Sequence, residues 1–359
     1  VLQEKLPQSL FAEFVARDVA GLGDAVGEQD QAVAGFEPDL ALLVFAFGEH
    51  AATLYAAGQQ WTCKLIHCPS RTFNPPNAPK KFAGIAVSLY GLRSNRNWGC
   101  GDFTDLAGFG AWAKAQCGAE FVALNPLHAI ANRTPYNTSP YLPASTYYRN
   151  FLYIDIEKIP EYTGCVRAQS LRGEIDPLLT RLRDSEFVDY EGVARIKVLF
   201  LKLLYREFLR GNPNRRQAFD KYRRDEGALL DKFATYCALD EYLHRRDKNL
   251  WVWPDWPEHF RDSNSDAVSE FTKRHWRRVE FWQYVFWLAD EQCAAAQQDL
   301  LTAGMSIGLY HDLALATSLG QIDVPAARAA SIVTMAGGEP TRLPLRERLT
   351  MKKLQAVPN

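Results

Sequence analysis

The clearest pattern in the chain is a pair of short apolar runs separated by one amphipathic stretch. The runs lie at residues 85–92 (IAVSLYGL) and 121–127 (FVALNPL), and the second lacks alternating polar side chains. Strands of this kind are buried on both faces, as in a parallel sheet covered by helices. We therefore predict a right-handed βαβ unit, in which the intervening stretch forms the crossover helix.

The crossover helix is predicted over residues 105–116, where apolar side chains recur at the spacing of a single buried stripe. The members of that stripe are Leu106, Phe109, Trp112 and Ala113. Asp102 or Thr104 would supply the N-cap oxygen, and Gly118 would end the helix. Asp102 is therefore expected to cap the helix and not to take part in chemistry.

Helical periodicity dominates residues 177–303. One apolar face is predicted along residues 190–209, formed by Val193, Ile196, Leu199 or Phe200, and Leu203 or Leu204. Further helices are predicted at residues 229–244 and 265–301. A third strand, parallel to the first two, is expected within residues 306–316 (SIGLYHDLALA), directly after the helices.

The N-terminal part has mixed patterns. A short helix is predicted at residues 10–19, followed by strands at 42–47 and 62–69, so residues 1–72 are interpreted as a β-rich module. Residues 73–81 contain three prolines and are interpreted as a linker.

Charge composition gives no indication of a polyanionic partner. The 359 residues include 41 Lys and Arg against 42 Asp and Glu, so we expect neither nucleic acid nor an anionic membrane as a partner. The basic stretch at residues 206–224 is interpreted as a solvated helix face and turn. No apolar run reaches the roughly 18 residues of a membrane span.

Seven cysteines are scattered without a CxxC pair, which favours free thiols in a reducing compartment. No signal peptide is visible at the start, and a cytoplasmic location is expected. Cys63 and Cys68 lack the second pair or His cluster of a zinc set, so no metal site is predicted. Cys100 is expected to be a small buried thiol.

Seven short blocks of the sequence carry a family resemblance. They are LIHCPSR (65–71), NWGCGDFTDL (97–106), LNPLHA (124–129), SPYLPASTYYRNFLYIDI (139–156), DWP (255–257), VEFWQYVFWLADEQ (279–292) and GMSIGLYHDLALA (304–316). In this order they resemble the 4-α-glucanotransferase family, also called amylomaltase or disproportionating enzyme. Because all seven keep the family's order, the resemblance is specific although each block is short.

The resemblance implies an α/β fold that is the first part of a (β/α)8 TIM barrel, beginning at residue 82. A large helical insertion, about residues 160–303, would separate the second and third strands, and residues 1–72 would be the remnant of the family's N-terminal module. Residues 317–359 show no likeness to the family. The barrel is therefore expected to be truncated after about three strands, leaving an open sheet edge.

An aromatic loop at residues 132–148 has the composition of a sugar site. Glucan binding needs flat aromatic platforms together with hydroxyl and amide groups, and the loop supplies both with little charge. The resemblance places Ser139 and Tyr141 at the sugar-binding cleft, in the family's SPY motif. Tyr147 and Tyr148 are expected to pack the loop.

Other candidates lie at the predicted strand ends. Asn125 and His128, in LNPLHA, are further substrate-binding candidates, although a hydrogen-bonded strut is the favoured role for His128. Asp312 follows the third strand, where functional side chains concentrate, and is preferred to His311 as a substrate contact. Trp98 is expected to pack beneath the first loop. The tryptophans at positions 251, 253 and 256 are assigned to core packing in preference to a second glucan surface.

The catalytic groups of the family are not found. Retaining glucan transfer needs a carboxylate nucleophile and a carboxylic acid about 5 Å apart. The family places these, with a transition-state-binding Asp, in blocks that resemble RxDH, ExLG and THD, and none of the three occurs in this sequence. We assign no catalytic residue, and the chemistry requires no cofactor.

Three functional hypotheses follow. The first is a 4-α-glucanotransferase that moves α-1,4-glucan segments between maltooligosaccharides in starch, glycogen or maltodextrin metabolism, with retention. The second is a catalytically inactive glucan-binding fragment that keeps the aromatic loop. The third is a pseudogene product without a stable fold.

Overall fold

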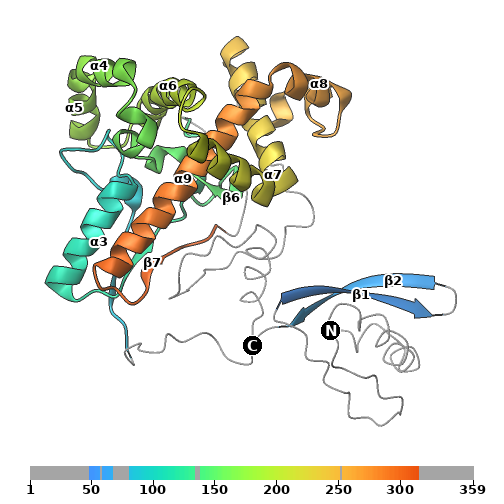
Figure 1. Ribbon diagram of the computed structural model, residues 1–359, viewed down its shortest axis with the longest axis horizontal. Helices are drawn as coiled ribbons and strands as arrows, with labels where there is room; N and C mark the ends of the chain where they lie inside the picture. Colours follow the sequence, from blue (N-terminus) through green and yellow to red (C-terminus); the bar gives the residue numbers. More distant parts are fainter. Residues whose placement is uncertain (1–47, 57–58, 68–80, 134–137, 251–252, 315–359) are drawn as a thin grey trace, which may run out of the picture. The chain divides into compact units, whose positions relative to one another are not determined.

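The computed structural model describes residues 48–56, 59–67, 81–133, 138–250 and 253–314 (Figure 1). The chain divides into two units, Val1–Thr72 and Phe73–Asn359.

The first unit contains an antiparallel hairpin. Strand β1 (Gly48–Ala56) pairs with strand β2 (Gln59–His67) along its whole length. Strand β2 overlaps the strand predicted at 62–69, whereas β1 was not predicted. The predicted helix at 10–19 and the predicted strand at 42–47 lie outside the described residues.

A three-stranded parallel sheet organises the second unit. Strand β4 (Phe121–Leu124) lies between strand β3 (Gly84–Val87) and strand β7 (Gly308–Tyr310). Both pairings are parallel, and they place Val122 beside Ile85 on one side and beside Leu309 on the other. The predicted parallel arrangement of the three segments is therefore confirmed.

The strands are shorter than predicted. Strand β3 ends at Val87 because Leu89–Gly91 forms a 3-10 turn. Strand β4 ends before Pro126, which has no N–H group to donate to the ladder. The third strand covers Gly308–Tyr310 and not the whole predicted segment.

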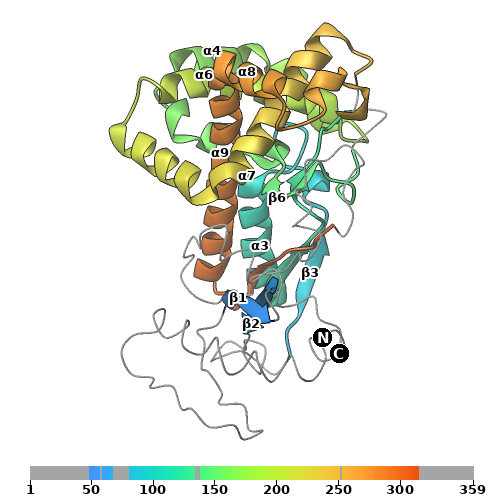
Figure 2. The ribbon, with the colours of Figure 1, turned by 90° about the vertical axis from the view of Figure 1, so that its right-hand side faces the viewer.

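Helices α3 (Phe103–Cys117) and α9 (Trp276–Thr302) run side by side along the sheet (Figures 1 and 2). The side chains of Val122, Leu124 and Leu309 on this part of the sheet are almost completely buried. A fully buried aliphatic side chain contributes roughly 1.5–3 kcal/mol to folding, so this layer is a principal source of stability for the strands.

Local sequence determines both ends of α3. The Asp102 carboxylate accepts hydrogen bonds from the N–H groups of Thr104 and Asp105, each at 3.0 Å, and the Asp105 side chain accepts one from the Asp102 N–H at 3.1 Å. This reciprocal arrangement is a capping box. Gly118 ends the helix in the left-handed conformation, with φ 64°. The predicted cap and stop are confirmed.

The predicted buried stripe of α3 is partly wrong. Leu106 and Ala113 are buried, but Trp112 is 53% exposed. At 100° per residue Trp112 lies about 120° away from Leu106 around the helix. The stripe that packs consists of Phe103, Leu106, Gly110 and Ala113.

The remaining helices form a layer around the end of α9 that is far from the sheet (Figure 2). They are α4 (Val166–Glu174), α5 (Asp176–Asp184), α6 (Tyr190–Phe208), α7 (Pro213–Arg246) and α8 (Asp266–Arg274). Aromatic rings fill their core; for example, the centroids of Phe208 and Tyr284 are 4.8 Å apart. None of the helices in the described part of the chain has the length and apolar character needed to cross a bilayer.

Helix boundaries depart from the predictions in two places, and burial resolves one alternative. Helix α7 begins at Pro213, sixteen residues before the predicted start, and is kinked at Gly227, where φ is 59°. The helix predicted at 265–301 is two helices, because His275 interrupts the run. On α6, Phe200 is buried whereas Leu199 is 47% exposed, which resolves the alternative left open by periodicity.

Short elements connect the longer strands and helices. Strand β5 (His128–Ala129) pairs antiparallel with strand β6 (Ser145–Arg149). Single 3-10 turns occur at Phe151–Tyr153, Ile156–Lys158, Pro160–Tyr162, Trp253–Asp255 and Glu258–Phe260.

The basic stretch at 206–224 is not simply a solvated face. Arg215 donates to Glu161 at 3.1 Å and to both carboxylate oxygens of Glu291 at 2.8 and 2.9 Å. Its guanidinium carbon also lies 4.1 Å from the ring centre of Trp287. Arg216 donates to buried Glu280 at 2.7 Å. These cations therefore hold α7 against α9, a role that periodicity alone did not indicate.

Candidate functional site

Polar side chains tie together the carboxyl ends of the three parallel strands. Asn125, directly after β4, accepts a hydrogen bond from the Leu89 N–H beyond β3, at 2.9 Å. His128 accepts one through Nε2 from the Ala314 N–H beyond β7, at 3.3 Å. Both side chains are buried. Asn125 and His128 thus fix the backbone at the edge of a sheet where ligands bind in α/β proteins.

Tyr141 and Asp312 meet at this edge. The Tyr141 side chain is 54% exposed, and its phenol lies near enough to the exposed Asp312 carboxylate for the two groups to interact electrostatically. The pKa of Tyr141 lies above its usual value because of partial removal from water and the negative charge of the nearby Asp312. A residue of the aromatic loop and a residue that follows β7 therefore form one surface.

Ser139 shapes the turn that carries Tyr141. Its Oγ accepts a hydrogen bond from the Tyr141 N–H at 3.3 Å, and its carbonyl oxygen accepts one from the Leu142 N–H at 3.2 Å. The Ser139 side chain is exposed, so its hydroxyl can reach a bound ligand as well as the turn.

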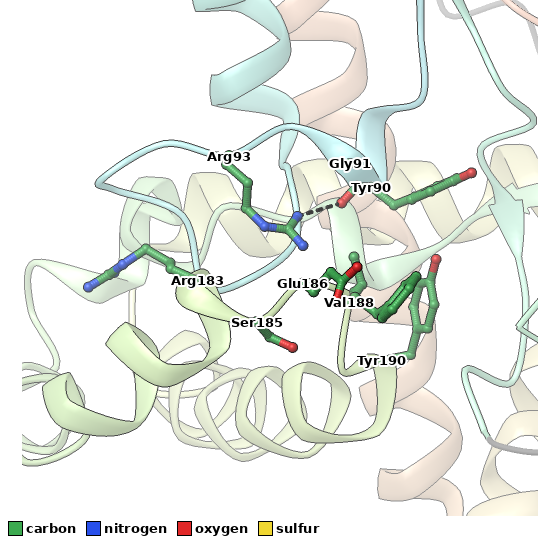
Figure 3. A pocket seen from close by; sticks show the side chains of 9 residues that line it. Tyr90, Gly91, Arg93, Arg183, Ser185, Glu186, Val188 and Tyr190 are labelled. Carbon is green, nitrogen blue, oxygen red and sulfur yellow. Dashed lines mark hydrogen bonds between the residues drawn. The ribbon is translucent and has the colours of Figure 1, made fainter.

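Tyr90 extends this surface toward a hollow of about 380 Å³ (Figure 3). Its phenol is among the groups that raise the pKa of Tyr141, and its ring lies 6.3 Å from that of Tyr190, edge to face. Arg93 donates to the Tyr90 carbonyl oxygen at 3.1 Å. The hollow is lined by Tyr90, Gly91, Arg93, Arg183, Ser185, Glu186, Phe187, Val188 and Tyr190.

Tyr90 and Tyr190 were not among the sequence candidates. Tyr90 lies inside the first predicted strand, so the rule that drew attention to strand ends did not select it; the observed strand β3 ends at Val87 and leaves Tyr90 beyond its carboxyl end. Nothing in the sequence around Tyr190 places it near Tyr90, because the two residues lie in different elements and are 100 positions apart.

The first loop and the cysteine within it are structural. Trp98 is buried, packs edge to face on Phe200 at 4.7 Å and donates from Nε1 to Glu157 at 3.0 Å. Cys100 is fully buried, and burial raises the pKa of its thiol to about 11. The expected packing roles of Trp98 and Cys100 are confirmed.

Most of the remaining aromatic candidates pack within the fold. Tyr148 is buried and stacks on Phe233 at 5.3 Å, whereas Tyr147 is only partly buried. Trp256 is almost completely buried and stacks on Tyr236 at 5.2 Å, in agreement with core packing. Trp251 lies outside the described residues.

The arrangement suits a neutral ligand rich in hydroxyl groups. It combines an exposed aromatic ring, a carboxylate that accepts hydrogen bonds and a serine hydroxyl. Among the residues directly after the three parallel strands, Asp312 is the carboxylate. The described residues contain no group of three or more His, Cys, Asp and Glu side chains that could hold a metal ion.

Comparisons with known proteins place the chain in one enzyme family. Residues 87–341 match the 4-alpha-glucanotransferase family, so the match extends past residue 316, where the resemblance was expected to end. The chain is 33% identical to the 4-alpha-glucanotransferase of Haemophilus influenzae over 79% of its own length and 42% of that protein. It is 35% identical to the enzyme of Mycobacterium tuberculosis over 75% of its length and 37% of that protein. The chain belongs to the 4-α-glucanotransferase family.

Solved structures give the same result. The amylomaltase of Corynebacterium glutamicum superposes with a TM-score of 0.59 at 28% identity, covering 80% of this chain and 40% of that one. An amylomaltase of Streptococcus agalactiae in complex with acarbose shares the fold at a TM-score of 0.53 and 15% identity, covering 71% and 48%. The chain spans about 40% of the length of the curated relatives it matches.

Proposed function

We propose that this chain carries part of the glucan-binding cleft of a 4-α-glucanotransferase. The activity is transfer of an α-1,4-glucan segment from a donor maltooligosaccharide to the 4-OH of an acceptor, with retention. Family membership supports the reaction class. The observation that carries the proposal for this chain is the contact of exposed Tyr141 with Asp312 beyond the carboxyl ends of parallel strands.

The proposed fold follows from the sheet. Strands β3, β4 and β7 are the first three strands of a (β/α)8 barrel, and helices α4 to α9, which lie between β4 and β7 in the chain, are an insertion. The parallel order β3-β4-β7 supports this assignment, as does the likeness to the C. glutamicum amylomaltase. The carboxyl ends of barrel strands are where active sites form.

Each proposed contact has a physical role. The ring of Tyr141 is a platform for the C–H face of a glucosyl unit. Asp312 accepts hydrogen bonds from sugar hydroxyls, and Ser139 donates or accepts one. Asn125 and His128 act beneath the sugar by holding the strand ends. We assign no catalytic carboxylate to the described residues. The proposal is therefore tested by measuring glucan binding.

The test is calorimetric titration with maltoheptaose, with cellohexaose as the β-linked comparison. The unsubstituted chain is expected to bind maltoheptaose and not cellohexaose. Tyr141→Ala should weaken binding by about 1–2 kcal/mol, the scale of losing one aromatic platform. Trp276→Ala removes an equally exposed ring at the far end of α9 and should leave affinity unchanged.

Absence of maltoheptaose binding by the unsubstituted chain would refute the binding proposal. Equal affinities for the Tyr141→Ala and unsubstituted chains would assign the loop to packing.

A further inference from the structure

The loop that presents Tyr141 begins at a constrained residue. Asn132 has φ 57° and is the non-glycine residue with positive φ among the described residues. This left-handed conformation is unfavourable for most L-residues, and Asn tolerates it better than most. A conformation of this kind persists only where surrounding contacts hold it.

A pair of buried amides holds Asn132. Its Nδ2 donates to Asn150 Oδ1 at 3.1 Å, and Asn150 Nδ2 donates in return to Asn132 Oδ1 at 2.8 Å. Asn132 also donates to the Ile130 carbonyl oxygen at 2.9 Å. Both Asn side chains are buried. The two reciprocal bonds therefore fix the backbone at the start of the loop, which we call the outgoing stem.

The next residue is anchored by the helical layer. Arg133 forms a two-point ion pair with Asp240 on α7, with Nη1 donating to Oδ1 at 3.1 Å and Nη2 donating to Oδ2. The two side chains are only 17% and 15% exposed. The partners are 107 residues apart in sequence. Two parallel N–H···O bonds fix direction as well as distance, which a single contact does not.

The end of the loop at Ala144 and Ser145, which we call the returning stem, is held by other contacts. The Ala144 N–H donates to the Ala129 carbonyl oxygen at 2.8 Å, and Ser145 pairs with Ala129 in the β5–β6 ladder. Breaking the Arg133–Asp240 ion pair would therefore remove one of the two anchors of the outgoing stem while the returning stem and the strands stay in place.

We propose that Asn132 and Arg133 are positioning residues for Tyr141, and that Asp240 couples the sugar-binding loop to helix α7. This inference rests on the proposed function. All three lie outside the set of proposed sugar contacts, which are Tyr141, Ser139 and Asp312. They reduce the conformational freedom that the Tyr141 loop would otherwise lose when a glucan binds, so their contribution appears in affinity as well as in stability.

Helix α7 offers a matched control at the next position. Glu241 is as buried as Asp240, at 16% exposure, but it pairs with Lys202 on α6 and with Arg278 on α9 at 3.5 Å. Asp240→Asn and Glu241→Gln each remove one negative charge with little change in shape. Both should lower the melting temperature, while only Asp240→Asn should act on the loop.

The experiment compares these two variants with the unsubstituted chain by maltoheptaose titration and by amide hydrogen exchange. Asp240→Asn is expected to weaken binding by between about 2-fold and 30-fold, the range seen for residues that act through others. It should also speed exchange in peptides covering residues 138–145. Glu241→Gln should match the unsubstituted chain in both measurements. Asn132→Gly, which keeps the left-handed backbone but removes the amide pair, should behave as Asp240→Asn does.

Unchanged exchange and affinity in Asp240→Asn would overturn the inference, as would equal losses in Glu241→Gln. If the unsubstituted chain does not bind maltoheptaose, the proposed function fails, and the exchange measurement alone decides whether Asp240 orders the loop. If Asp240→Asn does not fold, Arg133→Lys is the second variant, because it keeps the positive charge but cannot form the two-point pair with Asp240. It should speed exchange in residues 138–145, as expected for Asp240→Asn, with a smaller loss of affinity.

Discussion

At the scale of single residues, exposure separates aromatic side chains with different roles. Tyr141 and Tyr148 lie seven positions apart in one loop, yet the first is 54% exposed and the second 4%. Tyr148 stacks on Phe233 in the helical layer, whereas Tyr141 contacts Asp312 at the strand ends. Composition identified the loop, and exposure selects the residue available to a ligand.

The contact between Tyr141 and Asp312 predicts a titration effect. Asp312→Asn removes a negative charge, which favours the protonated phenol, so the pKa of Tyr141 should fall toward its usual value. Carbon-13 NMR of labelled tyrosines measures the pKa of Tyr141, whose signal is identified by its loss in Tyr141→Phe. Burial, followed by neighbours other than Asp312, raises the pKa of Tyr190 to about 12. This pKa should therefore be the same in Asp312→Asn as in the unsubstituted chain. An unaltered Tyr141 titration would show that the two groups are not in contact.

At the scale of elements, the first loop approaches the strand ends so closely that one position admits no side chain. A Cβ atom on Gly101 would overlap the carbonyl oxygen of Leu89 and approach Cβ of Leu92 at 2.8 Å. Backbone atoms cannot move aside without disturbing β3. In contrast, a Cβ atom on Gly108, on the exposed face of α3, would meet nothing within 4 Å.

These two glycines give opposite predictions for the same substitution. Gly101→Ala should destabilise the chain by at least about 2 kcal/mol through overpacking. Gly108→Ala should stabilise it by about 0.5–1 kcal/mol because Ala is the better helix former. Urea denaturation followed by circular dichroism measures both. Equal effects would contradict the close approach at Gly101.

Glu120 connects three elements and predicts an acid-sensitive stability. Its carboxylate accepts hydrogen bonds from Lys114 at 2.7 Å and from the Ser306 N–H and hydroxyl, both at 2.9 Å. The Lys114 bond, followed by the Ser306 bonds, outweighs partial burial and lowers the pKa of Glu120. A carboxyl group with a lowered folded pKa stabilises the fold above its unfolded pKa, about 4.3. That stability is lost as pH falls through the lower, folded value.

Glu120→Gln should therefore lower the free energy of unfolding at pH 7 by about 1–2 kcal/mol, the scale of hydrogen bonds to a charged group. The difference from the unsubstituted chain should shrink as the pH falls below about 4.3. Thermal melts from pH 3 to pH 7 measure it. A difference that is constant across that range would show that the charge of Glu120 is not involved.

At the scale of the whole molecule, the parallel sheet and the helical layer are joined through α9. The sheet supplies strand ends for a site, and the helical layer holds the loop that reaches it through Asp240. Among the residues directly after β3, β4 and β7, Asp312 is the carboxylate, and the sequence contains none of the RxDH, ExLG and THD blocks.

The 359-residue polypeptide is accordingly expected to bind maltooligosaccharides without disproportionating maltotriose. Removing one member of a cooperating catalytic set already costs orders of magnitude in rate. Incubation with maltotriose, followed by chromatography for glucose and longer oligosaccharides, measures turnover. Rates near those of ordinary enzymes, about 1–1000 per second, would show that the catalytic residues are present and unassigned.

Several features were available from the sequence because they depend on neighbouring residues. The cap at Asp102, the stop at Gly118 and the parallel strands around Val122 follow from local hydrogen bonding and apolar periodicity. The family resemblance was also carried by short contiguous blocks. The position of Asp312 after its strand followed from the same pattern.

Contacts between distant residues were decided by the tertiary structure. Arg133 and Asp240 are 107 positions apart, and Lys197 is buried within an apolar helix face, where it donates to the carbonyl oxygens of Leu152 and Ile154. A pattern along the chain records which side of a helix is apolar, but not which distant carboxylate or carbonyl group will face a cation. Those partners are determined only when packing brings the segments together, because charge pairing in a folded chain depends on distance and burial.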